Sequence, residues 1–247
     1  MTGIRPKILR YESLPSTNTE VARLAAQGAE EGLAIVADEQ TAGRGRLQRV
    51  WVSPKGAGLY FSLLLRPKIP TEQWPLITFA AAVAVGDALL EACKVETDIK
   101  WPNDLLAGER KICGILAEVV DGGVVVGIGI NLTREAYPSE LNEAAVSVAE
   151  FTGVQPDRET VLAALIRGLQ RWYALLNEPG GAEKLIATWE SRSTYVSGKT
   201  VRVVNGDEIL EGTTRGLERD GALRLETKNS ELRIIRAGDV VSLRRSL

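Results

Sequence analysis

The segment Gln40-Thr41-Ala42-Gly43-Arg44-Gly45-Arg46-Leu47-Gln48-Arg49-Val50-Trp51 lies between two apolar, strand-like runs at residues 33–37 and 59–65. Its glycines allow the backbone to approach a ligand closely. Its arginines are planar, permanently charged groups that suit carboxylates and phosphates. This segment, called the arginine loop below, is therefore predicted to project from a β-sheet that holds both of its ends, and to face an anion.

Outward from the arginine loop, strand-like and helix-like patterns follow one another along the chain. Thr17 with Glu20 fits a capping box at the start of a helix, and Gly28 fits its end. Asp121-Gly122-Gly123 is typical of the turn in an antiparallel hairpin. The expected strands cover residues 8–11, 33–37, 58–65, 111–120 and 124–132, and the expected helices cover residues 17–27, 74–93, 158–176 and 182–191.

A second polar cluster, Asp98-Ile99-Lys100-Trp101-Pro102-Asn103-Asp104, follows the apolar helix. Its Trp-Pro pair favours an extended conformation at Trp101, whose side chain we expect in the core or in support of the turn. Glycines also interrupt the strands of the hairpin, at positions 114, 127 and 129. Such glycines indicate either a ligand lying against the sheet or a bulge or tight packing. The residues alone leave both interpretations open.

The segment from Thr200 to Leu247 differs in character from the rest of the chain. It contains short β-rich runs at residues 201–204, 209–214, 223–226, 232–235 and 240–243, separated by Asn205-Gly206, Asp220-Gly221 and Gly238-Asp239. Closely spaced short strands of this kind are typical of a small barrel. The sequence therefore predicts two domains, residues 1–193 and residues 194–247.

The composition argues against several classes of protein. The formal net charge of −2 does not suit a general nucleic-acid-binding protein. The N-terminus lacks the pattern of a signal peptide, and the longest apolar stretch, residues 76–85, is too short to cross a bilayer. Cys93 and Cys113 lie among apolar neighbours and are expected to be buried thiols. We expect a cytoplasmic protein without a membrane or DNA partner.

Histidine is absent from the sequence. Its absence removes the Ser-His-Asp and Cys-His nucleophilic arrangements, histidine general bases and zinc sites that contain histidine. Any chemistry must therefore use lysine, arginine, carboxylates, amides, hydroxyls or the backbone. This favours a reaction that is catalysed by positioning and by neutralisation of charge.

The glycine-rich segments do not match the common nucleotide motifs. The chain contains no Gly-x-x-x-x-Gly-Lys-Ser/Thr sequence, and Gly43-Arg44-Gly45 lacks the third glycine of a Rossmann fingerprint. The basic loop, Lys100, Lys111 and the Asn-Asp pair could instead hold a carboxylate and a nucleoside triphosphate together. Joining these two anions as an acyl-adenylate requires no covalent nucleophile on the enzyme, and it usually requires Mg²⁺.

Several stretches resemble, in order, the motifs of biotin–protein ligases, also called biotin–[acetyl-CoA-carboxylase] ligases. These are Ser16-Thr17-Asn18, Gly43-Arg44-Gly45-Arg46 with Trp51, Lys100-Trp101-Pro102-Asn103-Asp104, Lys111 to Glu118, and Gly127-Ile128-Gly129-Ile130-Asn131. The order and spacing agree over the whole chain. The C-terminal β-rich segment resembles the SH3-like domain of the same family.

The resemblance implies an α/β (α+β) fold: a catalytic domain related to class II aminoacyl-tRNA synthetases, with helices against one side of a mixed β-sheet, followed by a small SH3-like β-barrel. It implies that biotin and ATP react, with Mg²⁺, to give biotinyl-5′-AMP and pyrophosphate. The biotinyl group then passes to a lysine of a biotin carboxyl carrier protein. The family also suggests a homodimer.

The resemblance further implies roles for individual residues. The biotin-binding residues would be Ser16, Thr17, Gln40, Gly43, Arg44, Arg46, Lys111, Gly114 and Gly127. The nucleotide-binding residues would be Arg44, Trp51, Asn103, Asp104, Lys111 and Asn131. The catalytic residues would be Arg46, Lys111 and Lys100, and Asp104 would be the ligand of Mg²⁺.

The sequence departs from the family pattern in two places. Many family members begin with a DNA-binding winged helix, whereas Ser16 already begins the first catalytic motif here, so we expect a ligase without repressor activity. The run Leu47-Gln48-Arg49-Val50 is less basic and less glycine-rich than the loop of some relatives. We therefore expect the mobility of the loop and its retention of the adenylate to differ.

Two other functions compete with biotin ligation. A lipoate– or octanoate–protein ligase would use the same adenylation chemistry, and a nucleic-acid-binding module could use Arg44, Arg46 and Arg49. Plainer alternatives exist for single residues as well. Lys111 could be a strand-edge lysine that deters aggregation, Glu118 a solvent-facing strand residue, and Cys113 a packed thiol.

Overall fold

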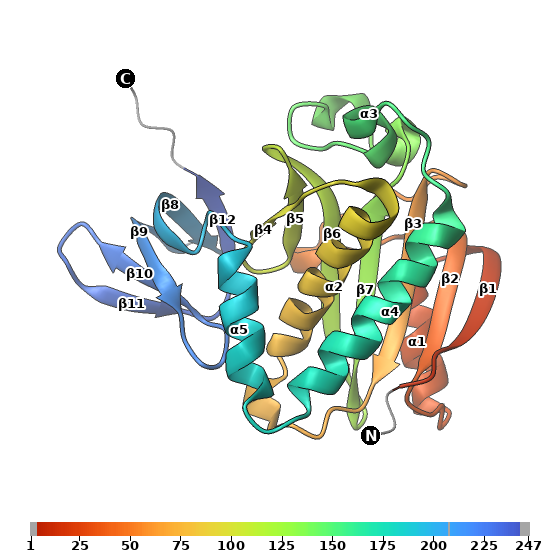
Figure 1. Ribbon diagram of the computed structural model, residues 1–247, viewed down its shortest axis with the longest axis horizontal. Coiled ribbons are helices and arrows are strands. Elements are labelled where there is room, and N and C mark those ends of the chain that lie inside the picture. The colour runs from red at the N-terminus through yellow and green to blue at the C-terminus, as the bar shows by residue number, and fades with distance from the viewer. Residues whose placement is uncertain (1–3, 207, 243–247) are drawn as a thin grey trace.

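Two β-sheets organise the residues that the computed structural model describes, 4–206 and 208–242 (Figure 1). The larger sheet contains β1 (Lys7–Leu14), β2 (Leu33–Gln40), β3 (Gly58–Leu65), β4 (Asp98–Lys100), β5 (Asp104–Ala107), β6 (Arg110–Val120) and β7 (Gly123–Asn131). The smaller sheet contains β8 (Ser197–Asn205), β9 (Glu208–Leu217), β10 (Leu223–Thr227), β11 (Leu232–Ile235) and β12 (Asp239–Ser242). The α-helices are α1 (Thr17–Ala26), α2 (Leu76–Cys93), α3 (Val148–Thr152), α4 (Arg158–Leu176) and α5 (Gly181–Ser191).

The larger sheet has the strand order β1-β2-β3-β7-β6-β5-β4. β1 and β2, which α1 connects, run parallel, and the other neighbouring pairs run antiparallel. The mixed sheet of the predicted α/β fold is thereby confirmed. β3 lies in the interior of the sheet with all of its residues buried, which explains its unbroken apolar sequence GLYFSLLL.

Helices cover both faces of this sheet, which corrects the expectation that they cover one side. α2 and α4 pack together on one face, visible in front of the sheet in Figure 1. α1 packs on the other face, where Val21 joins Ile35 and Leu64 in a second apolar cluster. Neighbouring residues of a strand point to opposite faces, so Ile35 and Val36 belong to different clusters.

The start of α1 differs from the capping-box prediction. Ser16 occupies the N-cap position, and Thr17 is the first helical residue. The Thr17 hydroxyl lies 3.0 Å from Gln40 Oε1, so it contacts β2 and does not cap the helix. The predicted end is confirmed, because Gly28 has a φ of +89° just beyond the helix. β1 and β2 also extend to Leu14 and Gln40, further than the apolar pattern indicated.

The smaller sheet packs against the end of the larger unit that carries α5 and the start of α2. Its strand order is β11-β10-β9-β8-β12, which confirms the predicted C-terminal β-rich unit, although Leu243 lies outside the described residues. Trp101 is buried, and its Nε1 donates to the Gly221 carbonyl at 3.0 Å, so this side chain packs in the core as expected. The boundary predicted between residues 193 and 194 falls between α5 and β8, and it stays a prediction.

α2 is the apolar helix at the centre of the core. Within the described residues, the segment Thr71–Cys93 that contains α2 is long and apolar enough to cross a membrane. However, 67% of its most apolar window is buried inside the protein, against the sheet, α4 and α5. Its composition is therefore explained by core packing.

Candidate active site

A cavity of about 270 Å³ lies beside the N-terminal end of α1. The start of α1 and strands β6 and β7 line it from the sheet, the arginine loop lines it from one side, and residues 136–145 line it from another. The predicted site residues that line it are Ser16, Thr17, Gln40, Arg44, Arg46, Trp51, Asn103, Asp104, Lys111, Gly114, Gly127 and Asn131. The fold thus brings separate stretches of the sequence to one place. Gly43 and Lys100 do not line the cavity.

Hydrogen bonds between side chains build a polar end of the cavity. The backbone N–H of Thr17 donates to Gln40 Oε1 at 2.8 Å. Gln40 Nε2 donates to Ser53 Oγ at 2.8 Å. These partners determine the orientation of the Gln40 amide, since a flipped amide would face its N–H groups toward the Thr17 N–H. A ligand entering here meets donors and acceptors in fixed positions.

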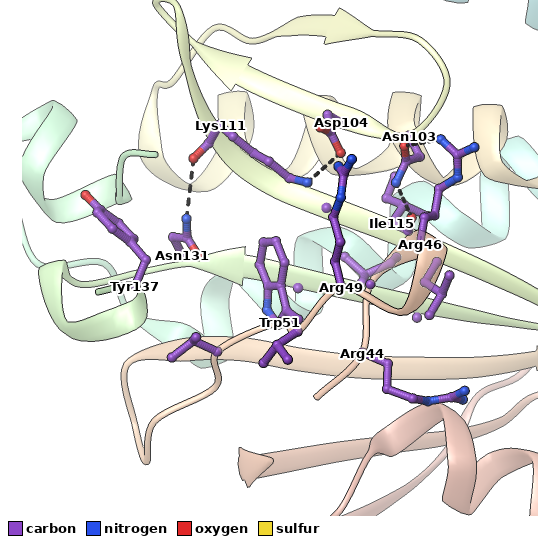
Figure 2. A pocket seen from close by; sticks show the side chains of 18 of the residues that line it. Arg44, Arg46, Arg49, Trp51, Asn103, Asp104, Lys111, Ile115, Asn131 and Tyr137 are labelled. Atoms are coloured by element: carbon purple, nitrogen blue, oxygen red, sulfur yellow. Dashed lines mark hydrogen bonds and ion pairs between the residues drawn. The ribbon is translucent and has the colours of Figure 1, made fainter. Parts of the chain in front are cut away.

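Lys111 places a cation in the middle of the cavity. Its Nζ lies 2.6 Å from Asp104 Oδ1 and 5.3 Å from the centre of the Trp51 ring (Figure 2). The residue pairs with β5 on one side of β6 and its backbone contacts residues 144–146, so it does not lie on a free sheet edge. The strand-edge alternative is therefore wrong. A ligand that carries an anion can take the place of Asp104 as the partner of Lys111.

Arg46 and Arg49 connect the arginine loop to the smaller sheet. Arg46 NH1 lies 3.2 Å from Asn103 Oδ1, 3.2 Å from the Gly238 carbonyl and 3.3 Å from Asp239 Oδ1. Arg49 forms an ion pair with Asp239 as well. Burial lowers the pKa of Arg46, and the charge of Asp239 partly opposes this shift. Asp239 therefore supplies a counter-ion to two cations of the loop.

Arg44 takes a different direction from the other two arginines. Figure 2 shows its side chain pointing away from Lys111 and Asp104. Its guanidinium forms an ion pair with Glu118 at 2.9 Å, and Glu118 also accepts a hydrogen bond from Asn18. Glu118 is therefore part of the site's surroundings, and the expectation that it simply faces solvent is wrong. The reason is that the loop folds back over the β6 strand.

Trp51 accounts for two of the strand glycines. A Cβ at Gly129 would lie 2.5 Å from the Trp51 ring, and a Cβ at Gly114 would lie 2.9 Å from it. At Gly127 a Cβ would overlap the Asn18 side chain. Tight packing thus explains all three glycines in this structure. The indole N–H of Trp51 is buried without a hydrogen-bond partner among the described residues, so it offers a donor to a ligand.

The two remaining predicted residues lie outside the cavity lining. Gly43 shapes the loop, since its carbonyl accepts from the Trp51 N–H at 3.0 Å and a Cβ there would overlap the Trp51 backbone. Lys100 is half-buried, with its Nζ 5.7 Å from the centre of the Tyr195 ring. Burial lowers the pKa of Lys100, while Asp104 acts in the opposite direction.

Sequence reasoning missed one whole wall of the cavity. Ala136, Tyr137, Pro138, Leu141, Ala144 and Ala145 form an apolar end beside Asn131. The segment lacks the periodicity of a helix or strand and folds into two short 3₁₀ turns, so no local pattern indicated it. Arg49 was also missed, although its place within the arginine loop was a usable signal. Asp239 lay too far away along the chain to be connected with the loop.

The carboxylates that line the cavity supply only some of the ligands that Mg²⁺ needs. Among the described residues, no group of three or more histidine, cysteine, aspartate or glutamate side chains gathers to hold a metal. Asp104 presents a carboxylate beside Lys111, and Asp239, which also lines the cavity, is paired with Arg46 and Arg49. Mg²⁺ is commonly bound by one or two carboxylates together with substrate phosphates. The donor set thus suits a metal that arrives with a nucleotide.

The fold and the cationic lining of the cavity suit a ligase that activates a carboxylic acid with ATP. Family models agree with this class: the biotin/lipoate A/B protein ligase family matches residues 11–134, and the biotin protein ligase C-terminal domain matches residues 196–242. The chain belongs to the biotin protein ligase family.

Individual relatives match over nearly the whole chain. The bifunctional ligase/repressor BirA of Bacillus subtilis is 37% identical over 242 residues, which cover 94% of this chain and 73% of the relative. The biotin–[acetyl-CoA-carboxylase] ligase of Mycobacterium tuberculosis is 35% identical, with coverage of 93% and 86%. The structure of the Aquifex aeolicus biotin protein ligase in complex with biotin and ATP superposes with a TM-score of 0.84, at 32% identity and coverage of 97% and 99%.

Proposed function

We propose that this protein is an ATP-dependent biotin–protein ligase. In the first step, a carboxylate oxygen of biotin attacks the α-phosphorus of ATP, and pyrophosphate leaves. In the second step, the ε-amine of a carrier lysine attacks the acyl carbon, AMP leaves, and the amine loses a proton. The observation that carries this proposal is a single cavity with a polar end, a cationic centre and an apolar end.

Each part of the cavity suits one part of the two substrates. The polar end at Ser16, Thr17 and Gln40 would receive the ureido ring, whose oxygen accepts and whose N–H groups donate. Arg46 and Lys111 would receive the biotin carboxylate and the phosphates. The apolar end, with Trp51, Asn131 and residues 136–145, would receive the adenine. One related structure holds both biotin and ATP, which supports a site that takes these two substrates together.

Catalysis would depend on charge neutralisation, because the chain has no histidine to serve as a base. Two anions must come together in the first step, and negative charge moves onto the pyrophosphate as it leaves. Fixed cations that face the developing charge stabilise such a transition state without reorganisation. Arg44, Arg46, Arg49 and Lys111 line the cavity, and of these Arg46 and Lys111 are the residues proposed as catalytic, as the family resemblance implies.

Asp104 would hold the Mg²⁺ that enters with ATP, together with phosphate oxygens. The metal would neutralise charge on the triphosphate. In the structure Lys111 forms an ion pair with Asp104, so the arrival of the nucleotide would give Lys111 a phosphate or carboxylate partner in its place. Asn103 stays bound to the Ile115 carbonyl at 2.8 Å and would present its amide oxygen beside Arg46.

The carrier partner follows from the relatives that are named biotin–[acetyl-CoA-carboxylase] ligases, which indicates a biotin carboxyl carrier protein. We also propose a homodimer, a cytoplasmic location and no DNA partner. Residues 116–120 of β6 pair only with β7 in the described part of the chain, so this strand offers a free edge to a second copy. The molar mass in solution, cell fractionation and a DNA-retardation assay, respectively, would test these three proposals.

Exchange of labelled pyrophosphate into ATP tests the proposed function. We expect exchange that requires biotin, followed by transfer of biotin to a lysine of a carrier domain. The same assay with lipoate and octanoate is the matched comparison, because those acids would use the same adenylation chemistry. Exchange with lipoate alone would refute biotin as the substrate, and no exchange with any acid would refute the adenylation reaction.

The pH dependence of exchange should report on Lys100. Because burial lowers the pKa of this lysine from its ordinary value of 10.5, its charge is lost at a lower pH than that of an exposed lysine. If this charge supports phosphate binding, the rate falls as the pH rises through the lowered pKa. The Lys100→Arg variant keeps its positive charge. Its rate of pyrophosphate exchange should therefore stay constant over the pH range in which the wild-type rate falls.

The rates would be measured between about pH 7 and 10. Lys199→Arg is the control, because Lys199 also lies over the Tyr195 ring, at 5.0 Å, but belongs to β8 of the smaller sheet. The control should follow the wild-type profile. An alkaline decline at the same pH in the wild type and in Lys100→Arg would show that the Lys100 charge has no part in the reaction.

A further inference from the structure

Glu118 is the point at which the arginine loop and α1 meet. Its Oε2 accepts from Asn18 Nδ2 at 2.7 Å and from Arg44 NH2 at 2.9 Å. Asn18 is buried, whereas the Arg44 side chain is 47% exposed. One carboxylate oxygen therefore joins a buried amide of the helix to a cation of the loop.

The amide of Asn18 is held on every side. Its Oδ1 accepts from Ser62 Oγ at 2.6 Å, and its Nδ2 also lies 3.2 Å from the Leu116 carbonyl. The side chain fills the space that Gly127 leaves open. If the amide were rotated, its oxygen would face the oxygens of Glu118 and Leu116. These neighbours therefore determine its orientation.

The same hydrogen bonds continue into the polar end of the cavity. Ser62 Oγ lies 2.7 Å from Thr17 Oγ1, which lies 3.0 Å from Gln40 Oε1. With the Ser62 proton on Asn18 Oδ1 and the Thr17 hydroxyl proton on Ser62 Oγ, an unbroken series runs from Arg44 through Glu118, Asn18 and Ser62 to Thr17, whose backbone N–H donates to Gln40 Oε1 at 2.8 Å. Polar networks in a half-buried site stabilise one arrangement when complete and become costly when one member is lost.

We propose that Glu118 is a positioning residue for recognition of the acid substrate. It orients Asn18, and through Ser62 it orients Thr17 at the polar end, while it anchors the base of the arginine loop through Arg44. This inference rests on the proposed function, because it assigns the polar end to the ureido ring of biotin. Glu118 acts through these neighbours and does not itself contact the substrate.

A second ion pair offers a matched control. Arg202 and Glu211, on β8 and β9, have side chains 45% and 28% exposed, compared with 47% and 32% for Arg44 and Glu118. Glu211 also accepts from two donors, Arg202 and Lys228. It lies outside the cavity lining. Glu211→Gln therefore measures the effect of weakening a comparable strand ion pair far from the substrate.

The test compares Glu118→Gln with Glu211→Gln in the full chain. Calorimetry gives the Kd for biotin, pyrophosphate exchange gives kcat, and thermal unfolding gives Tm. The introduced amide keeps one oxygen for the two donors but lacks the negative charge of the carboxylate, so the hydrogen bonds from Arg44 and Asn18 are both weakened. We expect Glu118→Gln to weaken biotin binding about tenfold and to change kcat by less than about twofold. The expected effects on Kd and kcat differ because contacts with the non-reacting end of a substrate stabilise the bound substrate and the transition state equally. Their loss therefore raises Kd and leaves kcat almost unchanged.

A double variant distinguishes positioning from general weakening of the fold. In an Asn18→Ala background, Glu118→Gln should raise the biotin Kd by less than about twofold, since its effect on the polar end passes through Asn18 and only the exposed contact with Arg44 is left to weaken. If the glutamine variant does not fold, Glu118→Asp replaces it, with an expected weakening of about threefold. A biotin Kd equal to that of Glu211→Gln, or independent effects of positions 18 and 118, would overturn the inference alone. A wild-type protein that does not bind biotin would overturn the proposed function, and this inference with it.

Discussion

Replacement of Lys111 by alanine is expected to lower the rate of biotin-dependent pyrophosphate exchange by about 10²–10³-fold while the fold survives. Lys111 is the lysine that lines the centre of the cavity, and its Nζ pairs with Asp104 at 2.6 Å. Its removal takes away a cation and leaves the Asp104 carboxylate where two anionic substrates must meet. The loss should therefore exceed that for an ordinary surface ion pair, which contributes about 0–1 kcal/mol.

Arg46→Ala tests the other half of the same cationic centre and should cause a loss of similar size. Arg46 also contacts the Gly238 carbonyl and Asp239, so we expect a small decrease in Tm for this variant and a smaller one for Lys111→Ala. Lys184→Ala, which removes an exposed lysine of α5, is the control and should keep the wild-type rate. Unchanged exchange in both Lys111→Ala and Arg46→Ala would contradict their assignment as the catalytic cations.

The parts of the fold that depend on local patterns were predictable from the sequence. β3 was correct to the residue because its apolar run is bounded by glycine and proline segments, and the β6–β7 hairpin was indicated by its turn. The motif residues also met at one cavity as the resemblance implied. The start of α1 was mispredicted because Thr17 has two possible partners, and its contact with Gln40, distant in sequence, prevailed over the local cap.

The parts that depend on contacts between distant residues could not be predicted. The position of Glu118 in the alternating pattern of its strand is that of a solvent-facing residue. It has Arg44 as a partner only because the arginine loop folds back over β6. Asp239 acquires its contact with Arg46 through the packing of the smaller sheet beside the larger one. In the same way, the three strand glycines proved to accommodate Trp51 and Asn18, which no single-sequence pattern connects with them.

The arginine loop is held in place by partly exposed ion pairs, and this makes its order sensitive to ligand. Arg49, which is 67% exposed, pairs with Asp239, and Arg44 pairs with Glu118. At the tip, Leu47 and Gln48 have φ angles of 52° and 60°, a left-handed conformation that is unfavourable for residues other than glycine. Weak anchors and a strained tip together favour a loop that opens readily when no substrate anion joins it to the cavity.

Trypsin should therefore cut the free protein after Arg44, Arg46 or Arg49, and biotin with MgATP should protect these sites. If cleavage requires the open, ligand-free loop, its rate falls by the factor 1 + [L]/Kd, which is about a hundredfold at a ligand concentration about 100 times Kd. Arg219, exposed in the turn between β9 and β10, is an internal reference whose cleavage should not change. Equal cleavage of the loop with and without substrates would show that it does not close over the adenylate. Selective protection would explain how the protein shields a labile acyl phosphate from water, since closure of a short loop is enough to exclude solvent.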